Sequence, residues 1–137
     1  MLDHLSIQCA DLDRSKAFYD TVLATIGGRR VMDFGDVVGY GTDFPDFWIG
    51  PAQTGAGFRE SHIAFLAPSR DAVDAFQQVA VALGMELLHK ARVWPEYHPG
   101  YYGAFVRDPT GTTSRPCTTP GSANARPPPR PTRRGGR

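Results

Sequence analysis

Two stretches of the chain share one hydrophobic pattern, 58 residues apart. Residues 4–24 read HLSIQCADLDRSKAFYDTVLA, and residues 62–82 read HIAFLAPSRDAVDAFQQVAVA. In both, apolar and polar residues first alternate with period 2, which is typical of a strand, and then recur at helical spacing. The helical pattern stops at Gly27 in the first stretch and at Gly84 in the second, and glycine commonly ends helices. The repeat predicts two equivalent structural modules.

Short apolar runs separated by turn residues follow each predicted helix. They lie at 30–34, 37–41 and 46–50 in the first module and at 85–93 and 101–107 in the second. A turn at 108–111 precedes one further strand, which the sequence leaves doubtful. The order βαβββ therefore occurs twice, in modules of about 1–55 and 58–111. Neither module could bury a core alone, so we predict one α+β domain in which the two pack together.

Composition separates the end of the chain from the rest. Residues 1–110 hold nine Lys and Arg and all 14 Asp and Glu, a net charge of −5. Residues 111–137 hold six arginines, no acidic residue and half of the 12 prolines. Such a segment buries too little apolar surface to offset the entropy lost on ordering. We predict a domain over 1–111 and a disordered Arg/Pro-rich tail over 112–137.

Several classes of protein and partner are excluded by what the sequence lacks. No apolar run approaches the roughly 18 residues of a membrane span, so we expect no membrane partner. The beginning, MLDHLSIQ, has no basic region of the kind that opens a signal peptide. Two cysteines make no disulfide framework, and we expect a cytoplasmic protein. The tail has no lysine, aromatic residue or predicted fold, so we expect no specific nucleic-acid partner.

Two histidines occupy equivalent positions in the repeat, His4 in the first module and His62 in the second. Strand alternation places His4 and Ser6 on the face opposite the helix, and His62 likewise. If a pseudo-twofold axis relates the modules, the two imidazoles converge as a metal site requires. The alternative is two separate histidines that form local hydrogen bonds. Because two histidines hold a metal poorly, such a site also needs a carboxylate.

A second candidate site is the aromatic segment PEYHPGYYGAF, residues 95–105. Its rings can form the wall of a ligand pocket, with hydroxyl and imidazole groups as polar contacts. The alternative is an ordinary strand whose aromatic residues cover the core. Trp48 presents the same choice between core residue and pocket floor. The candidate pocket residues are Ser6, Trp48, Tyr97, His98, Tyr101, Tyr102 and Phe105.

Three segments together carry a resemblance to a known family. They read DHLSIQCADLDRSKAFYDTVLATIGGRRV, ESHIAFLAPSRDAVDAF and HPGYYGAFVRDPTG. Over about 1–111 the chain resembles the glyoxalase/bleomycin-resistance/extradiol-dioxygenase proteins, the vicinal oxygen chelate (VOC) superfamily. The resemblance implies a curved mixed sheet around a cup, a small-molecule substrate and a possible homodimer. It also implies that His4 and His62 bind a divalent metal (Fe, Mn, Zn or Ni) together with a glutamate in the last strand.

The chain departs from the family pattern at that glutamate. Where relatives have a run such as GNNIEAV, this sequence reads GTTSRPC, with Arg115 in the glutamate position and Pro116 after it. One inserted adenine in a possible coding sequence of GNNIEAVC produces GTTSRPC, so we hypothesise that the segment and the tail are frameshift products. We expect a severe loss of metal affinity. Because proline and arginine suit a central strand poorly, the last strand is in doubt, and its loss would expose an edge.

The functional prediction follows from the resemblance and from this departure. We predict descent from a metal-dependent enzyme that acts on a small vicinal-oxygen substrate, with the metal site impaired in this chain. A lyase or isomerase and a ring-cleaving dioxygenase both remain open. Trp48 stands where some relatives have a fourth metal ligand, which slightly favours the three-ligand site of the dioxygenases. The alternative is a metal-free binding protein like the drug-sequestering members of the family. A third reading is a truncated product without activity.

Overall fold

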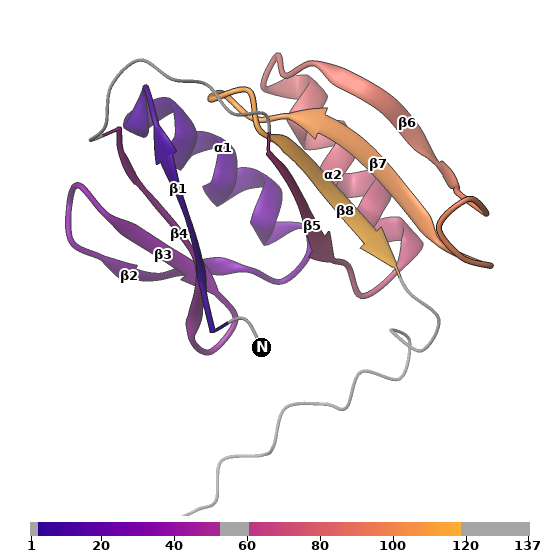
Figure 1. The fold of residues 1–137 in the computed structure, drawn as a ribbon, viewed down its shortest axis with the longest axis horizontal. Coiled ribbons are helices and arrows are strands. Elements are labelled where there is room, and N and C mark those ends of the chain that lie inside the picture. Colours follow the sequence, from indigo (N-terminus) through magenta and orange to yellow (C-terminus); the bar gives the residue numbers. More distant parts are fainter. Residues whose placement is uncertain (1–2, 53–60, 119–137) are drawn as a thin grey trace, which may run out of the picture.

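The computed structural model describes residues 3–52 and 61–118, which form two βαβββ modules (Figure 1). The first module contains β1 (Leu5–Cys9), α1 (Leu12–Ala24), β2 (Arg29–Asp33), β3 (Val38–Gly41) and β4 (Pro45–Pro51). The second contains β5 (His62–Leu66), α2 (Arg70–Ala82), β6 (Leu87–Val93), β7 (Tyr102–Arg107) and β8 (Thr113–Thr118). The predicted order of elements and the α+β class are confirmed.

The two modules repeat one sheet topology. The first sheet has the order β1-β4-β3-β2, and the second has the order β5-β8-β7-β6. The first strand of each module pairs in parallel with the last strand, and the remaining neighbours are antiparallel. β1 and β5 are therefore equivalent edge strands, and β4 and β8 are equivalent inner strands. The candidate histidines belong to the edge strands, His62 in β5 and His4 directly before β1, and the inner strands β4 and β8 carry Trp48 and Arg115.

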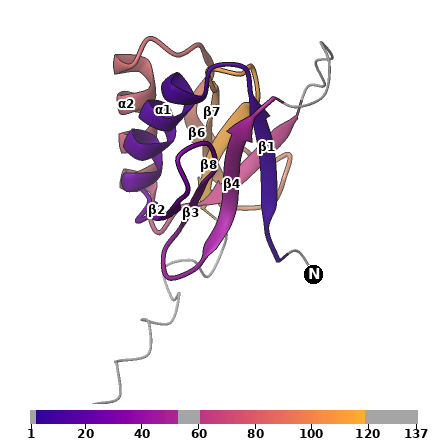
Figure 2. The ribbon, with the colours of Figure 1, turned by 90° about the vertical axis from the view of Figure 1, so that its left-hand side faces the viewer.

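Both helices pack on the same side of the strands, as Figure 2 shows. Each begins at a side-chain cap, Asp11 for α1 and Ser69 for α2, which accepts a hydrogen bond from a backbone amide of the first turn. The main core lies between the helices and the strands and combines residues of both modules. Its fully buried members include Tyr19, Val22, Ile49, Phe76 and Val106. The opposite face of the strands is left open, and it carries the candidate site.

A buried carboxylate ties the second module to the first. Asp108, in the turn before β8, is 4% exposed and accepts a hydrogen bond of 2.8 Å from the Tyr19 hydroxyl of α1. Its other oxygen accepts from the amides of Thr110 at 3.0 Å and Thr112 at 2.6 Å. Burial raises the pKa of Asp108, while these hydrogen bonds to the carboxylate oppose the shift. The same group thus shapes the turn and joins the modules.

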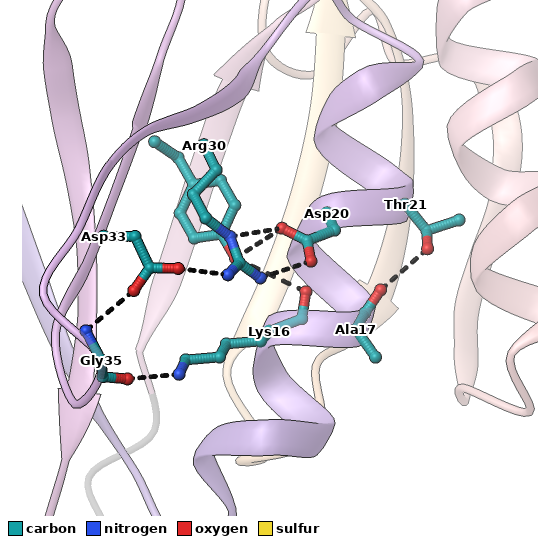
Figure 3. Close-up of polar contacts among 8 residues, drawn as sticks. Lys16, Ala17, Asp20, Thr21, Arg30, Asp33 and Gly35 are labelled. Atoms are coloured by element: carbon teal, nitrogen blue, oxygen red, sulfur yellow. Dashed lines mark hydrogen bonds and ion pairs between the residues drawn. The ribbon is translucent and has the colours of Figure 1, made fainter.

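An ion-pair network ties β2, an edge strand of the first sheet, to α1 (Figure 3). Arg30 of β2 donates to both carboxylate oxygens of Asp20, at 3.2 and 2.6 Å, and to Asp33 at 2.5 Å. Asp33 in turn accepts from the Gly35 amide, and Lys16 donates to the Gly35 carbonyl. Hydrogen bonds to the two carboxylates raise the pKa of Arg30 further above its usual range. Because Arg30 is paired with two carboxylates, its charge is balanced within the protein and needs no ligand.

The last strand, which the sequence left in doubt, is present. β8 lies between β5 and β7, so the sheet continues past residue 111, where we placed the end of the domain. Backbone pairing with two neighbours outweighs the poor strand propensity of the segment. The predicted tail beyond Thr118 lies outside the described residues.

Pro116 leaves a local defect in this strand. The β7–β8 register passes directly from Gly103–Cys117 to Val106–Ser114. Thr113 and Cys117 use their backbone groups on β5, so the nitrogen of Pro116 faces β7, and it has no hydrogen to donate. The strand is therefore retained with a gap in its ladder, next to Arg115.

Candidate functional site

The candidate site lies on the open face of the strands, away from the helices. Along β5, His62, Ala64 and Leu66 are exposed, whereas Ile63 and Phe65 pack against the core. The exposed residues therefore mark the open face. In the first sheet, the equivalent alternation places Ser6 on this face, as predicted.

The register makes Trp48 and Arg115 equivalent positions of the two modules. In the first sheet Ser6 pairs with Trp48, and in the second sheet Ala64 pairs with Arg115. Each pair lies two residues beyond its module's histidine, His4 or His62. Arg115 stands where the resemblance places the third ligand, and Trp48 stands where some relatives have a fourth. The repeat thus relates these two positions.

The two candidate histidines line one cavity. His4 directly precedes β1, and His62 begins β5. A cavity of about 480 Å³ between these edge strands is lined by both histidines, with Phe47 and Phe65 among its apolar walls. The His4 imidazole is exposed, and its Nδ1 lies 2.8 Å from a carboxylate oxygen of Asp3. The two histidines that the repeat relates therefore border the same space.

Arg115 lies in a cage of three aromatic rings. Its guanidinium carbon lies 4.6 Å from the ring centroid of Tyr97, 5.1 Å from Tyr101 and 4.9 Å from Phe105. We call these three rings and Arg115 the Arg115 cage. Nε and Nη1 of Arg115 and the hydroxyl of Tyr101 are buried without a hydrogen-bond partner. Cation–π contact stabilises the charge, but buried donors without acceptors cost free energy.

His62 lies beside this cage. Its imidazole meets the Phe105 ring edge-on, with centroids 5.5 Å apart. Burial, and then the positive charge of Arg115, lower the pKa of His62. The imidazole is therefore neutral near pH 7 and keeps one nitrogen that can donate and one that can accept.

Two aromatic residues that the sequence analysis did not select complete the cluster. Trp94 lies 4.8 Å from Phe105, and His89 lies 5.2 Å from the same ring. The predicted residue His98 packs edge-on against Tyr101 at 4.9 Å. The register of β6 with β7 contains two shifts, so counting along the sequence could not bring His89 opposite Phe105.

Tyr102 does not join the cage, which corrects its assignment to the pocket. It follows Tyr101 directly, and strand alternation turns successive side chains to opposite faces. Its hydroxyl donates to Asp74 of α2 at 2.7 Å, and the guanidinium of Arg70 lies 5.1 Å from its ring. Tyr102 therefore packs against the helix, where it helps to position α2.

Trp48 lies on the open face but has a different neighbour. Its ring stacks on Phe34 with centroids 6.3 Å apart and planes 3° from parallel. Gly39 of β3 lies beneath the indole: a Cβ on Gly39 would approach the Trp48 ring to 2.9 Å and the Pro45 Cβ to 2.7 Å. Trp48 and Phe34 thus form a separate apolar surface on the first sheet, and Ser6 is the register partner of Trp48.

Substituting Gly39 tests the position of Trp48. We expect Gly39→Ala to lower the free energy of unfolding by about 1–3 kcal/mol, because the added methyl group must displace a rigid ring. Gly50→Ala is the matched control, since its added Cβ would meet no atom closer than 3.5 Å and should change stability by less than about 0.5 kcal/mol. Urea unfolding measures both. Equal effects of the two substitutions would contradict the packing of Trp48 over Gly39.

The residues present do not complete the divalent metal site that the resemblance implies. The third position carries a guanidinium beside His62 in place of a carboxylate, and a cation there repels a metal ion. Among residues 3–52 and 61–118 there is no group of three or more His, Cys, Asp or Glu side chains that could hold a metal. His4 and His62 alone do not supply the donor set that such a site needs.

Comparison with known proteins identifies the family. The sequence matches the model of the Glyoxalase/Bleomycin resistance protein/Dioxygenase superfamily over residues 1–114. The chain belongs to this superfamily. Among curated proteins, none matches the sequence. The resemblance to VOC proteins is thereby confirmed.

Solved structures of VOC proteins share the fold. A glyoxalase/bleomycin resistance protein from Albidiferax ferrireducens T118 is 26% identical with a TM-score of 0.72, covering 85% of this chain and 97% of its own. Lactoylglutathione lyase from Agrobacterium tumefaciens is 22% identical with a TM-score of 0.60, covering 84% and 90%. Fosfomycin resistance protein FosX from Mesorhizobium loti is 19% identical with a TM-score of 0.61, covering 87% and 92%. Within the described part of this VOC chain, no helix is long and apolar enough to cross a membrane.

Proposed function

We propose that this VOC protein binds a small oxygenated molecule on its open face without a divalent metal, and that it descends from a metal-dependent enzyme. The observation that carries the proposal is the guanidinium of Arg115, held within 4.6–5.1 Å of three rings beside His62. The resemblance assigns this position to a glutamate ligand. An arginine there changes the local charge from negative to positive.

Electrostatics and packing both support binding in place of metal chemistry. The Arg115 charge lies against aromatic rings, away from the full screening of water, so its repulsion of a second cation is stronger than at the surface. The rings and the adjoining cavity of about 480 Å³ have the size and composition of small-molecule sites. Two similar solved structures, a lactoylglutathione lyase and a fosfomycin resistance protein, are of proteins that act on or protect against small molecules.

The ancestral activity is proposed only as a class. His4 and His62 still line one cavity, which supports descent from an enzyme with a metal between them, either a lyase or isomerase or a ring-cleaving dioxygenase. Arg115 in the third position supports loss of that activity in this chain. A homodimer and a cytoplasmic location remain part of the proposal, as does the origin of residues 112–137 in a frameshift.

Metal content and ligand binding together test the proposal. The full chain, purified without chelators, should contain less than about 0.1 divalent ion per chain by elemental analysis, because two imidazoles beside a guanidinium bind weakly. After treatment with EDTA it should still bind benzamide, a small neutral oxygenated aromatic probe, with saturable shifts of tyrosine ring resonances in NMR. Stoichiometric metal, or loss of all probe binding with EDTA, would contradict metal-free binding.

A further inference from the structure

We propose that the Arg115 cage is an anion site that binds the carboxylate of a small aromatic monocarboxylic acid. The inference rests on the proposed function and names its ligand class. This ligand class is indicated first by the positive charge of Arg115, which no carboxylate among the described residues pairs with. Arg30, Arg92 and Arg107 each have a carboxylate partner, at 2.6, 3.4 and 3.2 Å. No ion pair or hydrogen bond joins Arg115 to any described residue, and two of its nitrogens are buried without an acceptor.

An anion would satisfy what the fold leaves unsatisfied. Buried N–H groups of a guanidinium form strong charge-assisted hydrogen bonds when a carboxylate reaches them. The hydroxyl of Tyr101 is a further buried donor without a partner in the same cage. Two neighbouring groups of the described chain therefore have unused donors, and a carboxylate has two oxygens with which to accept.

The position of Arg115 is suited to binding because it is held before a ligand arrives. It stands on β8, an inner strand paired on both sides, and its guanidinium is packed against rings from β7 and the preceding loop. A side chain fixed in this way loses little conformational entropy on binding. Arg92 offers the contrast: it lies over Trp94 but is half exposed and is paired with Glu96.

The surroundings favour an aromatic acid with one negative charge. Tyr97 is 51% exposed, so its ring can stack on a planar ligand. The cavity begins next to the cage, since Ala64 lines it and pairs with Arg115. Asp3 and Asp46 of the first module also line the cavity, and their charges would repel a second anionic group. A single carboxylate at Arg115 with an apolar ring in the cavity fits this gradient of charge.

Comparing benzoate with benzamide separates the contribution of the ligand's negative charge to binding from the contribution of its aromatic ring. On the full, EDTA-treated chain, isothermal titration calorimetry should give a Kd for benzoate at least about 10-fold lower than for benzamide. In Arg115→Met, which fills the cage without a charge, we expect this preference to fall to about onefold. Arg92→Met is the matched control, a second arginine over an aromatic ring of the same sheet, and it should keep the preference.

The outcomes distinguish this inference from the function on which it rests. Benzamide binding with no preference for benzoate overturns the anion site and leaves metal-free binding in place. Binding of neither probe overturns both. A preference for benzoate that survives in Arg115→Met overturns the assignment to Arg115, and a preference lost equally in Arg92→Met would reduce it to a general effect of surface charge.

Discussion

Replacing Asp108 with alanine should lower the free energy of unfolding by about 3 kcal/mol, the largest single-residue effect on stability that we expect. Three donors lose their acceptor at once: the buried Tyr19 hydroxyl, the buried amide of Thr112 and the partly buried amide of Thr110. Tyr19 is fully buried, so water cannot replace the lost carboxylate without opening the core. Urea unfolding followed by far-UV circular dichroism measures the change.

Asp108→Asn is the control for this substitution. The amide oxygen can still accept from Thr110 and Thr112, and the amide NH₂ can donate to Tyr19, so the loss should be about 1 kcal/mol. The two variants thus separate the loss of hydrogen bonds from the loss of charge. If Asp108→Ala were as stable as Asp108→Asn, the turn would not join the two modules as described.

Restoring the run NNIEAV at residues 112–117 should create a metal site, the largest functional change that we expect. The restored chain carries six substitutions: Thr112→Asn, Thr113→Asn, Ser114→Ile, Arg115→Glu, Pro116→Ala and Cys117→Val. Position 115 already lies on the open face beside His62, so a glutamate there would join the two histidines. We expect about one divalent ion per restored chain by elemental analysis, against less than about 0.1 in the present chain.

The control for the restored chain has glutamine at position 115 and the other five substitutions unchanged. It repairs the strand, including the backbone donor that Pro116 lacks, but it supplies no carboxylate. Metal in the restored chain and not in this control would support a site of His4, His62 and the new glutamate, and with it the frameshift. Metal in neither would contradict the inherited site and assign both histidines a structural role. Sequencing the gene tests the frameshift independently.

The fate of β8 shows where local reasoning fails. Arg115 and Pro116 are poor strand residues, and their sequence alone left the strand in doubt. The structure places them in the sheet, because β5 and β7 offer backbone partners on both sides. The proline still has a local effect, because the pairing of β8 with β7 is interrupted at Pro116. Strand formation depends on neighbours that are distant in the sequence, and propensity does not contain them.

The composition of the Arg115 cage likewise depends on neighbours that are distant in the sequence. Tyr97, Tyr101 and Phe105 were selected from one aromatic segment, and they do lie together. Tyr102 came from the same segment but faces α2, because the strand begins at Tyr102 and alternation turns its side chain to the helix. That Arg115 lies among these rings follows from the pairing of β7 with β8, and that pairing could not be read from composition or spacing.

By itself, the sequence determined the repeat of two βαβββ modules, the ends of the helices to within a few residues of Gly27 and Gly84, and the equivalence of His4 and His62. These features depend on periodicity and on turn residues, which are local properties of the chain. Only the tertiary structure decided that β8 joins its sheet, that Asp108 binds Tyr19 of the other module and that Arg115 is caged without an acceptor. Those features depend on which distant groups are buried together, because burial and strand register arise only when the whole domain packs.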